Sequence, residues 1–171
     1  MYEHAAIYAL SDFIAAAREC FKVCDKDSIP RQLCQLLTHA LKEQLFVNDC
    51  FKDAGWTGKK ILYEDDRYGF CVCGHINVEV KESQPHNHGP SWAIYGQVAG
   101  RSSMVEWQQV FPATDHAKGK VKQLKCYNVE PGDVYLYDVG QIHSQTRTPG
   151  LLIRIEGQNL ERIQKQVFEA V

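Results

Sequence analysis

The sequence predicts a mainly β domain, a sandwich or barrel, with helices before it and a short helix after it. Between residues 57 and 157 the chain consists of short segments rich in Val, Ile, Tyr and Phe, separated by Gly, Pro, Asn and Asp. In the preceding 56 residues apolar side chains recur with helical spacing. With 171 residues the chain is expected to form one domain. Its parts are a helical segment 1–56 packed on the barrel, the barrel 57–157 and a C-terminal helix 158–171.

Two helices are expected in the N-terminal segment. Ser11 is the candidate N-cap of the first, and Ser28, followed by Pro30, that of the second. The apolar stripe of the first helix consists of Phe13, Ala16, Ala17, Cys20 and Phe21. That of the second consists of Leu33, Leu36, Leu37, Ala40 and Leu41.

Seven segments are candidate strands, and one segment near the end is a candidate helix. The strands are "KKILYE", "GFCVCGHINVEV", "SWAIYGQVAG", "SMVEWQQVF", "VKQLKCYNV", "DVYLYD" and "LLIRIEG". Asn159 is positioned to cap the final helix, "LERIQKQVFEA". Many short strands at near-regular spacing favour a sandwich or a barrel.

Composition excludes several classes of function. A net charge of −2 gives no electrostatic basis for binding nucleic acid. No apolar run is long enough to span a bilayer, and the N-terminus lacks the pattern of a signal peptide, so a cytoplasmic location and no membrane partner are expected. Seven cysteines without a spaced framework are expected to remain thiols there. The Cys71 and Cys73 pair is expected to be buried packing rather than half of a zinc site.

Candidate metal ligands stand in "SQPHNHGPSWAIYGQVAG". On an extended segment residues two apart face the same way, so His86 and His88 present both imidazoles to one side. Neutral ring nitrogens are ligands that zinc, iron, copper and nickel accept. Alone the pair is a weak signal, because it is one H-x-H among seven histidines.

A third histidine follows in "VEPGDVYLYDVGQIHSQ". Here a strand is followed by a turn containing Gly140, and His143 begins the next strand. This pattern and the earlier H-x-H together resemble the two halves of the cupin signature, over roughly residues 60 to 157. The resemblance implies a double-stranded β-helix, or jelly-roll, barrel in which His86, His88 and His143 converge on one metal ion.

The glutamate that usually follows H-x-H in cupins is absent, since Trp92 and Ala93 occupy its places. Glu106 lies on the next strand, but its spacing does not match. Three neutral imidazoles leave the charge of a divalent ion uncompensated, which favours an anionic, chelating substrate such as a thiolate or an enolate, with room for dioxygen beside it.

A three-histidine shell is similar to that of the thiol dioxygenases, the ferrous cupins related to cysteine dioxygenase and 3-mercaptopropionate dioxygenase. The resemblance implies Fe(II), with Zn, Ni or Mn as other candidates, and His86, His88 and His143 as the ligands. The chain departs from that group on its late strand, "LLIRIEG", and in lacking a secure counterpart of the early-strand arginine. It therefore looks like a separate branch beside that group.

Three further residues are candidates for catalysis. Arg154 and Glu156 share one face of "LLIRIEG". Arg154 there either binds a substrate carboxylate, forms a structural pair with Glu156 or Glu106, or is a simple rim residue. If Ala93, Tyr95 and Gln97 point inward, Tyr95 can donate a hydrogen bond to dioxygen or substrate, and Gln97 can orient a ligand histidine.

The expected function is a ferrous dioxygenase that converts a small thiol into a sulfinate. Its partners would be a small anionic substrate and dioxygen, and the chain would be a monomer or a homodimer. Two alternatives remain open: a metal-dependent isomerase or lyase that uses a side chain as base, and a metal-dependent module that binds a small molecule without turnover.

Overall fold

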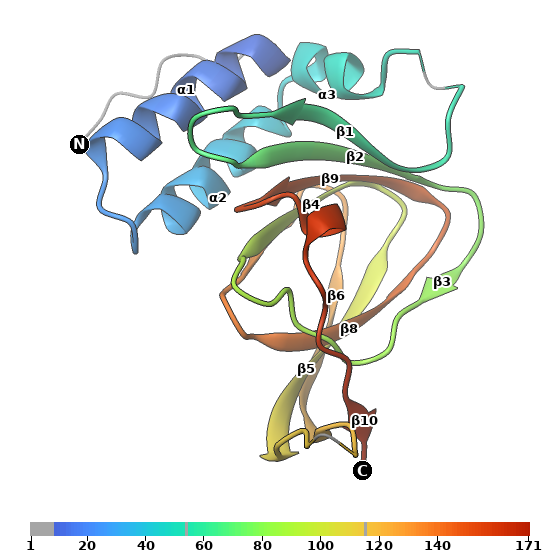
Figure 1. Ribbon diagram of the computed structural model, residues 1–171. Coiled ribbons are helices and arrows are strands. Elements are labelled where there is room, and N and C mark those ends of the chain that lie inside the picture. The colour runs from blue at the N-terminus through green and yellow to red at the C-terminus, as the bar shows by residue number, and fades with distance from the viewer. Residues whose placement is uncertain (1–8, 54, 115) are drawn as a thin grey trace.

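The computed structural model describes residues 9–53, 55–114 and 116–171, where three helices precede a barrel of two facing β-sheets (Figure 1). Residues 1–8 of the predicted helical segment lie outside the described residues. The helices are α1 (Leu10–Val23), α2 (Ile29–Ala40) and α3 (Gln44–Phe51). The strands are β1 (Gly58–Glu64), β2 (Cys71–Asn77), β3 (Lys81–Glu82), β4 (Ala93–Ala99), β5 (Ser102–Phe111), β6 (Lys120–Val129), β7 (Val134–Tyr137), β8 (Ile142–Arg147), β9 (Gly150–Glu156) and β10 (Glu169–Ala170).

The strands form two five-stranded sheets between which the chain alternates. The first sheet has the order β1-β2-β9-β4-β7, and the second has the order β10-β6-β5-β8-β3. From β4 onward the chain passes from the first sheet to β5 and β6 in the second, back to β7, across to β8 and back to β9. This crossing between facing antiparallel sheets is the jelly-roll arrangement. The expected mainly β, double-stranded β-helix barrel is therefore confirmed.

The helices cover the outer face of the first sheet (Figure 1). Leu33, Leu36 and Leu37 of α2 are almost completely buried in one cluster with Ile94 of β4 and Ile153 of β9. The second turn of this amphipathic helix thus packs on the side chains that alternate outward from the sheet. Within residues 9–53, 55–114 and 116–171, no helix is both long and apolar enough to cross a bilayer.

The helix starts differ in detail from the predicted caps. Ser11 lies inside α1, which has Ala9 at its N-cap, and the Asp12 carboxylate accepts the Ala9 N–H at 3.0 Å. Ser28 does occupy the N-cap position of α2, but its hydroxyl donates to the carbonyl and the carboxylate of Asp25 and accepts no N–H of the helix. Asp12 thus takes part in capping α1 two residues earlier than expected, and Asp25 competes with α2 for the Ser28 hydroxyl.

The predicted C-terminal helix is wrong beyond its first turn. Asn159 does cap a turn, accepting the N–H of Glu161 at 3.0 Å, but this 3-10 turn ends at Arg162. The following residues 163–171, here called the C-terminal strap, are extended, and β10 pairs in parallel with β6. The strap buries Phe168 against Val121 and Ile142, and these tertiary contacts outweigh the helical propensity of the segment.

Replacing Leu37 with Ala should lower the free energy of unfolding by about 2–5 kcal/mol, because it removes a fully buried side chain between α2 and the sheet. Leu45→Ala is the matched control, since Leu45 is 55% exposed and its loss should cost less than about 0.5 kcal/mol. Urea denaturation of both variants measures the difference. Equal losses would show that α2 does not anchor the helical layer.

Candidate metal centre

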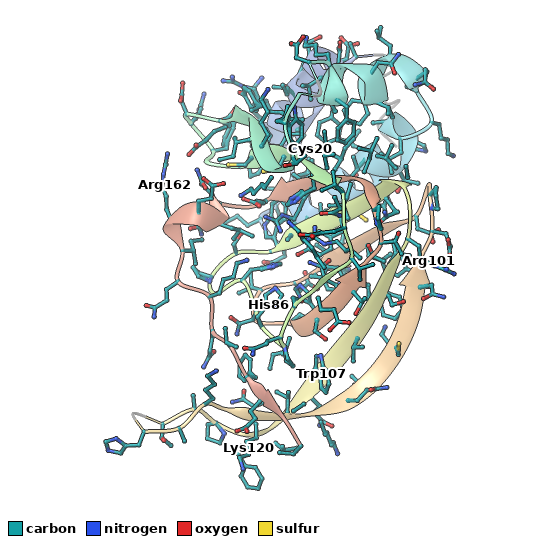
Figure 2. All side chains as sticks on the ribbon, turned by 90° about the vertical axis from the view of Figure 1, so that its right-hand side faces the viewer. Cys20, His86, Arg101, Trp107, Lys120 and Arg162 are labelled. Atoms are coloured by element: carbon teal, nitrogen blue, oxygen red, sulfur yellow. The ribbon has the colours of Figure 1, made fainter. Side chains whose placement is uncertain are left out.

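The three histidines predicted as ligands come together inside the barrel. His86 and His88 lie on the segment between β3 and β4, and His143 lies on β8. Their ligand nitrogens all lie within 4.8 Å of one another, and all three residues are buried. Figure 2 shows His86 within the barrel, between the helical layer and the end that carries Trp107 and Lys120. This is the arrangement required for one metal ion.

A backbone contact fixes the distance between the two parts of the chain that carry these ligands. His86 donates its N–H to the His143 carbonyl at 2.9 Å, and His143 donates to the His86 carbonyl at 3.0 Å. On its other side His86 forms an isolated bridge with Val167 of the C-terminal strap. The H-x-H segment is thus held as a short strand between β8 and the strap.

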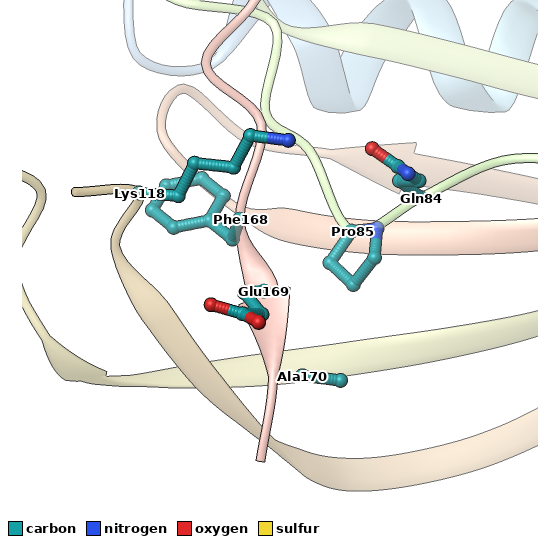
Figure 3. A pocket seen from close by; sticks show the side chains of 6 residues that line it. All are labelled: Gln84, Pro85, Lys118, Phe168, Glu169 and Ala170. Atoms are coloured by element: carbon teal, nitrogen blue, oxygen red, sulfur yellow. The ribbon is translucent and has the colours of Figure 1, made fainter.

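The strap also supports the loop around His88. The Asn87 N–H donates to the Gln166 carbonyl, and the Asn87 side-chain amide donates to the Gln166 side chain, both at 3.2 Å. Gly89 has a φ of 59°, and a Cβ there would lie 3.1 Å from Ile163, so this position favours glycine. Figure 3 shows the neighbouring surface pocket, where Phe168 of the strap lies near Pro85.

Hydrogen bonds select which ring nitrogen is available for a metal. The Nδ1 of His86 lies 2.8 Å from the Gln84 carbonyl, and the Nδ1 of His143 lies 3.4 Å from the Gln141 carbonyl. A carbonyl can only accept, so each Nδ1 carries the proton and each Nε2 keeps its lone pair. Ligand histidines in metalloproteins are oriented in this way, and the donor set therefore fits a divalent metal ion.

Burial keeps the three imidazoles neutral at physiological pH. Burial, with a contribution from the charge of His86, lowers the pKa of His143 to about 3. Burial also lowers the pKa values of His86 and His88, the latter far below its usual value. Neutral imidazole is the form that binds a metal, so the site needs no proton release before binding.

Tyr95 stands beside the ligand nitrogens. Its side chain points into the barrel, as do those of Ala93 and Gln97, while Ile94 packs against the helices. The Tyr95 hydroxyl lies 3.2 Å from the Nε2 of His88 and 3.5 Å from the Nε2 of His143. The hydroxyl therefore lies at the candidate metal centre, beside two of its ligand nitrogens.

The pairing of Arg154 with Glu156, one of the alternatives for Arg154, is present in the structure. Both point into the barrel and form a buried ion pair. Glu156 also accepts from Lys59, at 3.0 Å, and from the backbone N–H of Leu160, at 3.0 Å. Burial by itself would raise the pKa of Glu156, but the Arg154 guanidinium, the Leu160 N–H and Lys59 together hold it below its usual value.

Two side chains considered from the sequence have other partners. The Glu106 carboxylate accepts from the Tyr127 hydroxyl at 2.8 Å and pairs with Lys125 at 3.0 Å. Gln97 donates to the Ala99 carbonyl and accepts from Ser102, so in this structure it orients no ligand histidine. Neither Glu106 nor Glu156 belongs to the ligand group found among the described residues, which consists of the three histidines alone.

Sequence reasoning missed several residues around the centre. The Tyr137 ring lies with its centroid 4.3 Å from that of His143 and forms one wall of the site. Gln145 and Arg147 share the inner face of β8 with His143, because successive side chains of a strand alternate. That alternation is legible in "IHSQTR" and could have identified them. No sequence pattern of this kind predicts that residues 163–171 form an extended strap beside the H-x-H segment, because that position depends on tertiary contacts.

Comparisons with known proteins give partial structural likenesses. No protein-family model matches the sequence, and no curated protein matches it. KdgF from Halomonas sp. is 14% identical, with a TM-score of 0.43 over 57% of this chain and 76% of that chain. The DMSP lyase DddQ from Ruegeria pomeroyi is 10% identical, with a TM-score of 0.45 over 64% of this chain and 50% of that chain. A cupin-2 domain containing protein from Shewanella frigidimarina is 15% identical, with a TM-score of 0.44 over 66% of this chain and 92% of that chain.

Replacing His143 with Ala should abolish stoichiometric binding of a divalent metal, because two neighbouring imidazoles remain as the only ligands of the described group. Elemental analysis after loading with Fe(II) or Zn(II) and gel filtration measures the bound metal. His116→Ala, at an exposed loop position, is the control and should bind as much metal as the wild type. Equal metal content in both variants would contradict a three-histidine centre.

Glu156→Gln should lower stability by about 3 kcal/mol near neutral pH, because it leaves buried cations without their carboxylate. The folded-state pKa of Glu156 lies below the usual 4.5, so the stability from this carboxylate is present above that pH and is lost as the pH falls through the folded-state value. The difference between wild type and variant in urea denaturation should therefore shrink in acid. Glu130→Gln, at an exposed ion pair, should show little difference at either pH.

Proposed function

We propose that this protein is a non-haem iron dioxygenase that acts on a small anionic thiol and yields a sulfinate. The observation that supports this proposal is the donor set. Three neutral, buried imidazoles converge, and no carboxylate of the described residues joins them. A divalent ion held in this way keeps its full charge in a site of low dielectric constant, so an anionic ligand is favoured.

The overall reaction balances without a further reactant. A thiolate and dioxygen combine into a sulfinate, so two S–O bonds form while the O–O bond breaks. Sulfur loses four electrons and dioxygen gains four. Iron(II), when bound, supplies the redox chemistry that joins these two partners.

The residues of the chain hold and orient the reactants. The Tyr95 hydroxyl, beside two of the ligand nitrogens, donates a hydrogen bond to a developing negative charge on oxygen or sulfur. Arg154 supports this tyrosine, because its guanidinium lies 5.6 Å from the centroid of the Tyr95 ring. Glu156 keeps Arg154 in place, which makes it a positioning residue.

The position of Tyr95 also favours a second candidate function, a redox-neutral lyase or isomerase on the same metal centre. A hydroxyl that touches the ligand nitrogens is placed to move a proton to or from a metal-held substrate. Such an enzyme would work with zinc, nickel or manganese and would not consume oxygen. Oxygen uptake therefore separates the two candidates, and tight binding without turnover would identify a binding module.

The expected setting of the reaction is part of the same proposal. Free thiols persist in the cytoplasm, and the described cysteines of this chain are all unpaired. A monomer or homodimer without nucleic-acid or membrane partners stays the prediction from the sequence.

The iron-loaded protein should consume about one dioxygen per thiol oxidised, while the zinc-loaded protein should consume none. Tyr95→Phe should reduce kcat by about 100-fold with unchanged iron content, because it removes only the hydroxyl. An oxygen electrode with cysteine, 3-mercaptopropionate and related thiols measures both, and His116→Ala serves as the control. Stoichiometric iron without oxygen uptake for any thiol would contradict the dioxygenase, and unchanged kcat in Tyr95→Phe would show that the tyrosine only lines the barrel.

A further inference from the structure

Buried polar atoms without partners gather on the inner face of the barrel. In the described part of the chain, five buried side-chain nitrogen or oxygen atoms have no hydrogen-bond partner. One is the indole nitrogen of Trp56, and the other four belong to His75, Gln145, Arg147 and Arg154. His75, Gln145 and Arg154 are each more than nine-tenths buried. Orphaned buried polar atoms are costly, so their concentration in one place indicates a ligand that satisfies them.

Strand register places these residues at increasing distance from the metal centre. On β8 the inner positions are His143, then Gln145, then Arg147, and the Cα atoms of the first and last are about 13 Å apart at the usual rise per residue. Arg147 is opposite Ser102, whose hydroxyl donates to Gln97 at 2.8 Å.

In the first sheet, the residues at the same height along the barrel as Arg147 are found by following the strand register from Gln97. Gln97 is opposite Leu152, and Leu152 is opposite His75. Arg147 and His75 therefore belong to one level of the barrel, beyond Tyr95 and Arg154 as seen from His143. We call this level the far level.

Charge at the far level is unbalanced. Arg154 shares the Glu156 carboxylate with Lys59, whereas no carboxylate of the described residues forms an ion pair with Arg147. Burial lowers the pKa of Arg147, and the charge of Arg154 adds to this effect, yet a guanidinium stays protonated in proteins. Water can satisfy its hydrogen bonds but not its charge, so an anion is the ligand that completes the site.

We propose that Arg147 is the main residue of an anion subsite at the far level, and that the substrate is an extended molecule with a metal-chelating thiolate at one end and a carboxylate at the other. The inference rests on the proposed function, in which the chelating end is held at the three histidines. Arg147 and Arg154 supply two neighbouring positive charges, and His75 and Gln145 supply unsatisfied polar atoms along the path. The separation along β8 makes this substrate longer than cysteine.

Binding of matched thiols to the zinc-loaded protein tests the subsite without oxygen chemistry. The probes are 6-mercaptohexanoate against 6-mercaptohexanol, and 3-mercaptopropionate against 3-mercaptopropanol, each titrated by calorimetry. The wild type should bind the longer carboxylate at least about tenfold more tightly than its alcohol, as expected for a charge-assisted guanidinium contact. The preference for the carboxylate should be smaller for the shorter pair, which cannot reach Arg147 as well.

Variants then assign the preference to one side chain. Arg147→Gln should reduce the preference of the longer pair to nearly equal affinities, while binding of the alcohol stays unchanged. Arg101→Gln is the matched control, because Arg101 is exposed, at 55%, and pairs with Glu130. Retention of the preference in Arg147→Gln would overturn the assignment. If that variant does not fold, the wild-type comparison decides: a preference no larger for the longer pair than for the shorter one rejects an extended substrate.

The outcomes separate this inference from the proposed function. If the carboxylate preference depends on Arg147 but the iron-loaded protein never consumes oxygen, the anion subsite is supported and the dioxygenase is rejected. If the iron-loaded protein consumes oxygen but shows no preference for the carboxylate, only the anion subsite is rejected. If no thiol binds the zinc-loaded protein, the subsite as proposed and the thiol substrate fail together.

Discussion

The paired backbone hydrogen bonds between His86 and His143 are the constraint on which the metal centre depends. The two residues are far apart in the sequence, yet each donates its N–H to the carbonyl of the other. A pair bonded in this way places its side chains on the same side of the ladder, which brings the two imidazoles together. The strap holds His86 from its other side through Val167, so the ligand cannot shift without breaking two sets of bonds. A preorganised donor set of this kind loses little freedom when a metal binds.

The balance of charge inside the barrel is the second constraint. The inner-facing carboxylate of Glu156 is shared by Arg154 and Lys59 and accepts a backbone N–H as well, so it has no capacity left for a metal. The histidines contribute no charge. A divalent ion at the centre and a guanidinium at Arg147 therefore both stand without negative partners on the protein. Because both positive charges lack a negative partner on the protein, the same argument favours an anionic group of the substrate at the metal and a second one at Arg147.

Part of the candidate site could be predicted from the sequence, namely the part that local patterns of a few residues describe. The H-x-H pair, the glycine turn before His143 and the strand-like setting of both resemble the cupin signature. This resemblance pointed to three candidate ligands that the structure brings together. The alternation of "LLIRIEG" and "SWAIYGQVAG" put Arg154 and Glu156 on one face of their strand and Tyr95 with Gln97 on one face of theirs. It left open which face points into the barrel, and the structure turns both of these faces inward. The alternation also left open whether Arg154 pairs with Glu156, because a spacing of two residues fits both a structural pair and a substrate fork. The folded barrel shows the ion pair with Glu156, and it leaves the Nε of Arg154 without a partner.

The C-terminal segment shows the limit of such reasoning. Its capping residue was predicted correctly, but the apolar residues Val167 and Phe168 fit a helical stripe and an extended strap equally well. Short-range pattern predicted a mainly β sandwich or barrel after a helical segment, because periodicity and turn chemistry act over a few residues. It predicted two N-terminal helices where the described residues form three, and the jelly-roll and the three candidate ligands came from the resemblance to the cupin signature. Tertiary structure alone decided the path of the strap, the pairing of the buried charges and the position of Arg147, whose guanidinium forms no ion pair with a carboxylate of the described residues. These depend on which strands become neighbours, and that is set by burial across the whole chain.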